Sequence, residues 1–151
     1  DRAKEAGVMR DPVLASLLRI NRQRMRYLRR ALAPWQYVGS MHLIVLYAGR
    51  NPGASQEDVA CFYALDKTSV ARDARRLEDM GHIRREISPH DRRQYQLFLT
   101  GAGGEMLEKL QHIYDGFQER LSAGVSQEDW ETLRSLLARL EENSCREPPV
   151  A

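Results

Sequence analysis

Residues 66–100 hold the side chains whose types and spacing best suit a chemical role in this chain. Asp66 can cap a helix, because its carboxylate can accept hydrogen bonds from the free amides of the first turn. Val70, Ala74 and Leu77 recur at intervals of four and three residues, so they form one apolar face. The opposite face carries hydroxyl and guanidinium groups, which contact bases and phosphates in DNA. These candidate DNA contacts are Thr68, Ser69, Arg72, Arg75 and Arg76.

A basic hairpin is expected directly after this helix. Gly81 can take the left-handed conformation that ends a helix, and residues 82–87 and 94–99 read as strands around a turn. A short capped helix over 55–63 completes a helix-turn-helix. The helix fits a DNA major groove and the hairpin can reach phosphates or the minor groove, which together predict a winged helix-turn-helix. Further candidate contacts are Ser55, Gln56, His90, Asp91, Arg92, Arg93 and Gln94.

Several motifs in this region resemble those of the MarR family of transcription regulators. The wing signature of that family is matched by Asp91-Arg92-Arg93, then Leu99-Thr100 and Gly101-Ala102-Gly103. The recognition helix and its exit are matched by Asp66-Lys67-Thr68-Ser69-Val70, Leu77-Glu78 and Gly81-His82-Ile83. The order of elements is similar over residues 10–142, and the motifs are specific within 55–104. The resemblance implies a homodimer that binds double-stranded DNA, with Arg93 in or near the minor groove and Asp91 orienting neighbouring basic groups.

The remaining elements are expected to position this DNA-binding head. Helical periodicity predicts helices over 11–32, 37–49, 101–122 and 126–142, with a break near Pro34. Their apolar faces are too extensive for one small winged helix to bury, which favours a twofold homodimer. The predicted fold class is mainly α with a small β wing, namely a winged helix-turn-helix plus N- and C-terminal dimerisation helices. The predicted single domain has dimerisation helices in 11–36 and 101–142, the winged helix-turn-helix in 37–100, and a flexible tail at 143–151.

Composition and charge fit such a protein. The 151 residues are 42% hydrophobic and 29% charged, which is ordinary for a soluble domain. Residues 1–100 hold 18 Lys and Arg against 11 Asp and Glu, whereas residues 101–151 hold 5 against 10. A basic front suits a polyanionic partner, although two solvated faces would give the same count. We expect a cytoplasmic protein with no membrane partner, because no secretion signal or long apolar run is apparent and only two cysteines occur.

A second candidate site lies between the first two predicted helices. The resemblance implies an effector pocket where the dimerisation helices meet the winged helix, often for small aromatic acids. Aromatic walls with an arginine suit a planar carboxylate. The alternative is ordinary hinge packing with the arginines in solvent. The candidate effector contacts are Arg19, Arg22, Trp35, Tyr37, Met41 and His42.

Other chemistries have weaker support in the sequence. Cys61 is expected to be buried in the inner helix and Cys145 to lie in the tail, which argues against, but leaves open, a thiol-based redox sensor. The four histidines lack metal-ligand spacing, and no nucleophile or phosphate-loop motif occurs, so we expect no cofactor and no enzyme. A winged helix that contacts proteins without operator specificity is the other alternative. The favoured hypothesis is a repressor that binds a pseudo-palindromic operator and is released by a small aromatic carboxylate.

Overall fold

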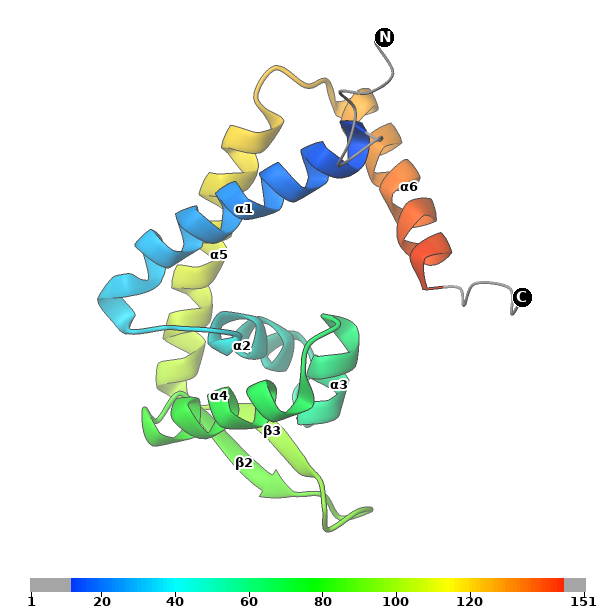
Figure 1. The fold of residues 1–151 in the computed structure, drawn as a ribbon. Helices are drawn as coiled ribbons and strands as arrows, with labels where there is room; N and C mark the ends of the chain where they lie inside the picture. Colours follow the sequence, from blue (N-terminus) through cyan, green and yellow to red (C-terminus); the bar gives the residue numbers. More distant parts are fainter. Residues whose placement is uncertain (1–11, 146–151) are drawn as a thin grey trace, which may run out of the picture. The chain divides into compact units, whose positions relative to one another are not determined.

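Helices dominate the computed structural model, which describes residues 12–145 (Figure 1). The chain divides into two units, one ending at Asp115 and the other beginning at Gly116. The helices are α1 (Pro12–Leu32), the 3-10 helix η1 (Ala33–Trp35), α2 (Met41–Arg50), α3 (Gln56–Phe62), α4 (Lys67–Asp79), α5 (Gly101–Ser122) and α6 (Gln127–Ser144). The strands are β1 (Ala54–Ser55), β2 (Ile83–Ile87) and β3 (Tyr95–Leu99).

The helix α4 begins and ends where the sequence predicted. The Asp66 carboxylate accepts a 2.8 Å hydrogen bond from the amide of Ser69, and Gly81 follows the helix with a φ of 76°. Val70, Ala74 and Leu77 are fully buried, so the predicted apolar face is confirmed. This stripe anchors α4 in the core of the first unit and leaves its polar side uncovered.

The helix α3 precedes α4 and starts with reciprocal capping. The Ser55 hydroxyl accepts a hydrogen bond from the Asp58 amide at 3.0 Å, and the Asp58 carboxylate accepts one from the Ser55 amide at 2.8 Å. These two bonds satisfy amides that the first turn of a helix would otherwise leave unpaired. The predicted helix-turn-helix is therefore present as α3 and α4.

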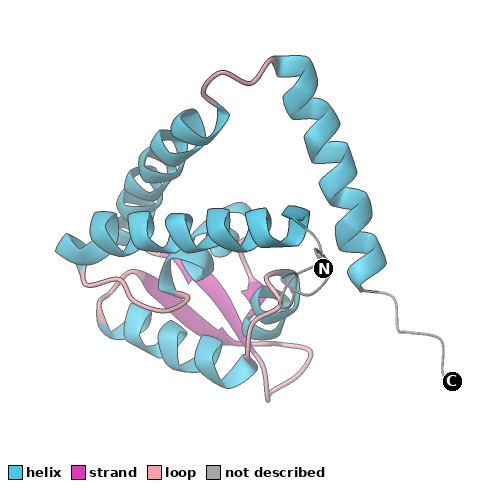
Figure 2. Ribbon diagram, turned by 45° about the horizontal axis from the view of Figure 1, so that its top comes forward, coloured by secondary structure: helices cyan, strands magenta, loops and turns pink. Residues whose placement is uncertain are grey.

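The hairpin of β2 and β3 belongs to a three-stranded antiparallel sheet of order β1-β3-β2 (Figure 2). In β2 and β3, Ile83 pairs with Leu99 and Ile87 pairs with Tyr95. The sequence analysis missed β1, in which Ala54 pairs with Leu97 of β3. This strand has only two residues, which is too short for an alternating pattern to indicate it.

The linker between α1 and α2 differs from the prediction. The helix predicted over 37–49 begins only at Met41, because Gln36 and Gly39 have φ values of 57° and 55° that interrupt helical backbone. Tyr37 is buried in this non-helical linker.

The last helix ends two residues later than the sequence predicted. The helix α6 runs to Ser144, so positions 143 and 144 of the expected tail are helical. Residue 11 and residues 146–151 lie outside the described part of the chain.

Both units carry exposed apolar side chains. In the first unit, Val13 and Leu14 of α1 are 52% and 56% exposed. In the second unit, Leu136 and Leu140 of α6 are 52% and 47% exposed. Among residues 12–145, no helix has the length and apolar character needed to cross a lipid bilayer.

The start of α5 generates a stability prediction. A Cβ atom at Gly103 would overlap the carbonyl oxygen of His82, whereas a Cβ at the neighbouring Gly104 would meet nothing within 4 Å. Gly103→Ala should therefore destabilise the chain by about 1–3 kcal/mol, because the overlap is with rigid backbone. Gly104→Ala should stabilise it by up to about 1 kcal/mol through the lower helical cost of alanine. Urea unfolding of both variants measures the difference; equal midpoints would contradict this account of the α5 start.

Candidate nucleic-acid interface and effector pocket

A polar groove joins the three elements that the sequence assigned to DNA contact. It has a volume of about 360 Å³ and lies among the starts of α3 and α4 and the hairpin. Its lining residues are Gln56, Glu57, Lys67, Thr68, Ala71, Arg93, Gln94 and Tyr95. Gln56, Thr68, Arg93 and Gln94 were predicted as contacts, so the fold brings them together although they are up to 38 positions apart.

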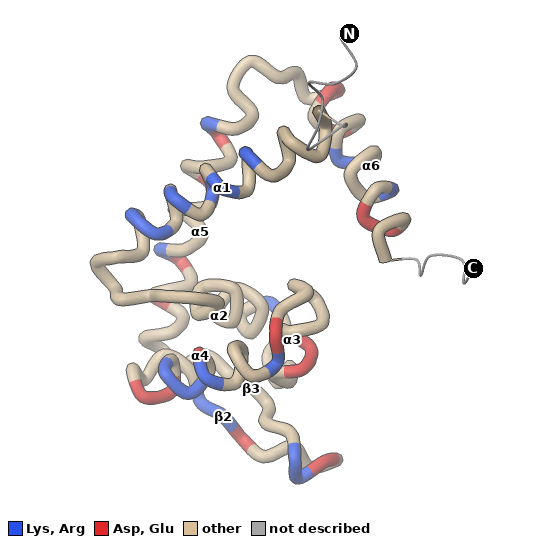
Figure 3. Tube along the Cα trace, in the orientation of Figure 1, with Lys and Arg blue, Asp and Glu red and all other residues tan. Residues whose placement is uncertain are grey.

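The recognition face of α4 is open to solvent. Thr68, Arg72, Arg75 and Arg76 are exposed, and the side chains of Arg72 and Arg76 retain 59% and 50% of their accessible surface. Ser69 is half-buried. In Figure 3 the basic positions of α4 and of the hairpin tip stand out in blue. The geometry leaves these guanidinium groups available to a partner.

The hairpin tip is organised by a chain of short-range bonds. The Ser88 hydroxyl accepts from the amides of His90 and Asp91 at 3.2 and 3.4 Å. One Asp91 oxygen accepts from the Arg93 amide at 3.0 Å and from Arg93 Nε at 3.4 Å. The Arg93 side chain is nevertheless 91% exposed. Asp91 therefore restrains the arginine while its guanidinium remains accessible, and Arg92 is exposed beside it.

Lys67 and Glu57 belong to the groove but were not among the predicted contacts. The Lys67 ammonium donates to a Glu57 carboxylate oxygen, and this interaction raises the pKa of Lys67. Gln94 Nε2 donates to the other Glu57 oxygen at 3.4 Å. Glu57 thus links α3 to α4 and to the hairpin. Lys67 directly follows the helix cap Asp66, so its position in the first turn of α4 could have identified it as a candidate contact.

Arg85 is a second residue that sequence reasoning missed. Its side chain is only 11% exposed, and Arg85 Nη2 donates to Glu78 at 2.8 Å. The guanidinium also lies 4.6 Å from the centre of the Tyr95 ring. This ion pair holds the pKa of the Glu78 carboxyl below its usual range. Arg85 therefore connects the end of α4 to both strands of the hairpin. Glu78 belongs to α4 and Arg85 to β2, so this ion pair joins the recognition helix to the sheet.

The predicted effector residues separate into core and surface groups. Tyr37, Met41 and His42 are buried, and the Tyr37 hydroxyl lies 2.6 Å from His82 Nδ1. Trp35 is half-buried beneath Lys109, whose ammonium lies 5.7 Å from a ring centre of the indole. Arg19 and Arg22 are exposed on α1.

Two clefts in the first unit border His42. One, of about 360 Å³, is lined by Arg24, Met25, Gly39, Ser40, His42, Leu43, Leu65, Asp66, Ser69, Arg72 and Asp73. The other, of about 380 Å³, is lined by Met25, Leu28, Arg29, Leu32, Tyr37, Val38, Gly39 and His42. Neither cleft is lined by Arg19 or Arg22. The arginines that line them are Arg24 and Arg72 in the first cleft and Arg29 in the second. Arg24 is two positions from Arg22, which on a helix turns a side chain to nearly the opposite side.

His42 has an unusual environment in these clefts. Its side chain is 5% exposed, and its Nε2 atom has no hydrogen-bond partner among the described residues. Burial lowers its pKa to about 4, and the positive charge of Arg24 adds to the shift while Asp73 opposes it. The imidazole is therefore neutral at physiological pH. Its ring centre lies 6.2 Å from that of Tyr114, whose pKa burial raises to about 12.

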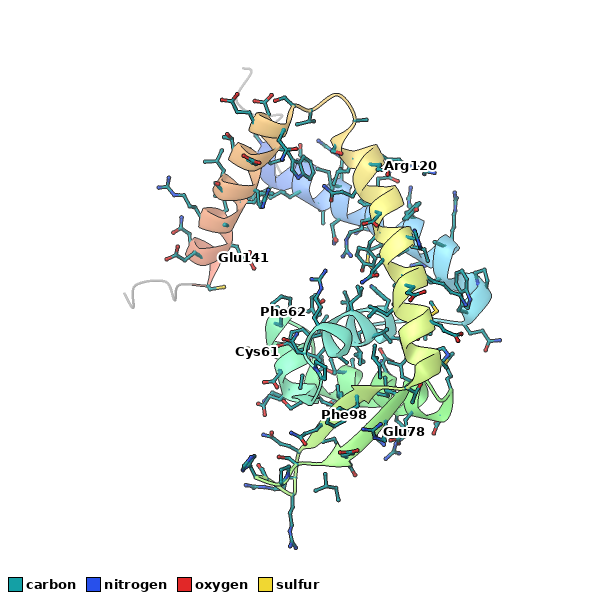
Figure 4. The ribbon with its side chains drawn as sticks, turned by 180° about the vertical axis from the view of Figure 1, so that it is seen from behind. Cys61, Phe62, Glu78, Phe98, Arg120 and Glu141 are labelled. Atoms are coloured by element: carbon teal, nitrogen blue, oxygen red, sulfur yellow. The ribbon has the colours of Figure 1, made fainter. Side chains whose placement is uncertain are left out.

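Both cysteines are exposed free thiols. The prediction that Cys61 is buried was wrong, because Val59 and Ala60 form the buried side of α3 while Cys61 and Phe62 lie outside it (Figure 4). Within residues 12–145, no three His, Cys, Asp or Glu side chains are grouped closely enough to hold a metal ion.

Comparison with known proteins agrees with this architecture. A sequence model of the MarR family matches residues 41–95, from α2 to the first residue of β3. A crystal structure of MarR superposes with a TM-score of 0.78 at 29% identity and covers 91% of this chain and 94% of its own. The chain thus resembles the MarR family both in the sequence of its winged helix-turn-helix and in its fold. A MarR regulator from Methanosarcina mazei shares the fold, with a TM-score of 0.76 at 24% identity over 87% of this chain and 95% of its own.

Sequence relatives are named as regulators too. The HTH-type transcriptional regulator BilQ of Clostridioides difficile is 26% identical over 107 residues, which are 71% of this chain and 72% of the relative. A putative transcriptional regulatory protein for the hcr operon of Thauera aromatica is 36% identical over 90 residues, which are 60% of this chain and 54% of the relative. MarR regulators bind DNA and typically act as dimers. These matches support a transcriptional regulator of the MarR type.

The environment of His42 generates a pH prediction. The unfolded imidazole is protonated near pH 6.5, whereas the folded one is protonated only near pH 4. Between these values the unfolded state binds more protons, so stability should fall as pH falls, by at most about 1.4 kcal/mol per pH unit for one group. His82, whose pKa burial also lowers, acts in the same direction. Urea unfolding at neutral and mildly acidic pH should show a flatter pH dependence for His42→Gln than for wild type; parallel curves would refute the role of His42.

Proposed function

We propose that this chain is a MarR-type transcriptional regulator that binds a pseudo-palindromic operator as a homodimer. The observation that carries the proposal is the groove that unites α3, α4 and the hairpin, with Thr68, Arg93 and Lys67 on its walls. These side chains offer hydroxyl, guanidinium and ammonium donors, the groups that contact phosphates and base edges. The exposed arginines of α4 continue the same chemistry along the helix.

In the proposed complex, α4 enters the major groove and the hairpin reaches the adjacent minor groove. Arg72, Arg75 and Arg76 would read bases or bind phosphates, and Arg93 would enter the narrow minor groove, where negative potential attracts a guanidinium. Ser55 and Gln56 lie at the N-terminus of α3 and would approach phosphate there. The DNA phosphate backbone would also be contacted by His90, Arg92 and Gln94. Asp91 would not contact DNA and would only orient Arg93.

The proposed dimer uses the apolar faces left uncovered in each unit. Exposed leucine and valine side chains on α1 and α6 suit burial against the same surfaces of a second copy. The proposed domain organisation keeps dimerisation helices in 11–36 and 101–142 on either side of a winged helix-turn-helix at 37–100. Two recognition helices related by a twofold axis require two half-sites, so the operator should be an inverted repeat.

The DNA-binding proposal is tested by selecting duplexes from a random library with the full chain. The selected duplex should contain an inverted repeat, and the complex should contain two chains by light scattering. Arg93→Ala should weaken binding to this duplex by about 1–3 kcal/mol, because one groove contact is lost. Arg50→Ala removes an exposed charge at the end of α2, outside the proposed contacts, and serves as the control. Equal affinities of Arg93→Ala and wild type would remove the hairpin from the interface.

Of the two clefts beside His42, we propose further that the one lined by Arg24 and Arg72 binds a small aromatic carboxylate, and that this ligand releases the repressor from DNA. Met25, Leu43 and Leu65 give this cleft apolar walls, and Arg24 and Arg72 give it positive charge. A planar ring with one carboxylate matches such a combination. Because Ser69 and Arg72 line the cleft and also lie on α4, a bound acid would act on the recognition helix itself.

The effector proposal is tested by comparing Arg24, which lines the cleft, with Arg19, which does not. Salicylate should bind the DNA-free chain more tightly than the operator complex, by a factor of roughly 5–150 for a typical coupling. Arg24→Gln should weaken salicylate binding, whereas Arg19→Gln removes an equal charge from an exposed part of α1 that does not line the cleft. Calorimetric titration provides the measurement. Equal loss in the two variants, or equal binding with and without operator, would eliminate this site.

A further inference from the structure

Asp73 is the one α4 carboxylate that lies in the protein interior. Asp73 is 1% exposed, whereas the neighbouring Arg72 and Arg76 of the same helix are exposed. A buried carboxylate needs hydrogen bonds or opposite charges, because its removal from water is otherwise costly. The contacts of Asp73 supply both.

The two carboxylate oxygens of Asp73 have separate partners. Oδ2 accepts hydrogen bonds from the Ser40 amide at 2.8 Å and from the Ser40 hydroxyl at 2.9 Å. Oδ1 faces the arginines, with Arg76 Nη1 at 3.4 Å and Arg72 Nε at 3.6 Å. One oxygen therefore fixes the carboxylate to the start of α2, and the other holds a guanidinium nitrogen of each of two exposed side chains.

The linker next to Ser40 is shaped to admit this carboxylate. Gly39 has a φ of 55°, and a Cβ atom placed on it would lie 2.5 Å from Asp73 Oδ2. A side chain at position 39 would thus meet both backbone strain and a steric overlap. The absence of a Cβ at this position is what allows the Ser40 amide to reach Asp73.

We propose that Asp73 is a positioning residue for DNA readout, which aims Arg72 and Arg76 and so sets the preference for operator over other DNA. This inference rests on the proposed DNA-binding function. Arginine reads guanine through a bidentate geometry, which a flexible side chain reaches only at an entropic cost. Non-specific binding to phosphates has no such geometric requirement. The negative charge of Asp73 repels DNA phosphates. Asp73 can therefore favour DNA binding only by orienting the arginines, and this effect should appear only for DNA that the arginines read.

Asp73→Asn is the central test, because the amide oxygen can still accept from Ser40 while the charge that holds the arginines is lost. Asp79→Asn is the matched control, since Asp79 is an exposed carboxylate of the same helix. Each full-length variant is titrated with the duplex that wild type selects and with a scrambled duplex of the same length and composition. For Asp73→Asn, the ratio of the two affinities should fall about tenfold or more, the scale of one bidentate base contact. The scrambled duplex should bind at least as well as to wild type, because one negative charge is gone.

The outcomes separate positioning from a purely structural role. A structural defect would weaken both duplexes alike, in step with the folded fraction measured by circular dichroism, and would overturn the proposal. A ratio equal to that of Asp79→Asn would overturn it as well. If Asp73→Asn does not fold, Ser40→Ala decides, since it removes one hydrogen bond and keeps the charge; its ratio should fall by a smaller factor, and an unchanged ratio contradicts the proposal. Failure of wild type to select any duplex would overturn the proposed function together with this inference.

Discussion

The burial of one stripe of α4 is the constraint on which the rest of the structure depends. Val70, Ala74 and Leu77 have no solvent exposure, so the rotation of the helix about its axis is fixed by the core. With 3.6 residues per turn, fixing the apolar side also fixes where the hydroxyl and guanidinium groups point. The cap at Asp66 and the left-handed residue at Gly81 set the two ends of the same helix, and the hairpin starts from there.

Acidic side chains around α4 act on basic side chains of the protein. Glu57 holds Lys67, Asp91 restrains Arg93, and Glu78 holds Arg85. Each pair joins a carboxylate to a cation that would otherwise sample many rotamers. For the exposed pairs the gain in stability is small, because water screens them. Their effect is on orientation, which matters for the groove contacts of the proposed function. Arg85 differs because it is largely buried and connects α4 to the hairpin.

Two candidate sites share the recognition helix. The polar groove contains Thr68 and Ala71, whereas the cleft beside His42 contains Ser69, Arg72 and Asp73. Neighbouring residues of a helix point about 100° apart, so one rigid element borders both surfaces. Under the proposed function, a ligand in the cleft would need no distant relay to reach the DNA-binding surface. It would influence DNA affinity only to the extent that it binds the free and DNA-bound forms differently.

The sequence by itself determined the features that depend on neighbouring residues. The limits of α4, the capping of α3, the two hairpin strands and the whole of α5 follow from caps, glycines and periodicity, which act within one or two turns. Tertiary structure decided the rest. The burial of Asp73 depends on Ser40, 33 positions away, and the start of α2 depends on the linker that forms this contact. Cys61 is exposed, and Arg24 lines a cleft that Arg19 and Arg22 do not line, because only packing selects which side of a helix is covered. A periodic pattern shows that a helix has two sides, but partners distant in sequence determine what each polar residue meets.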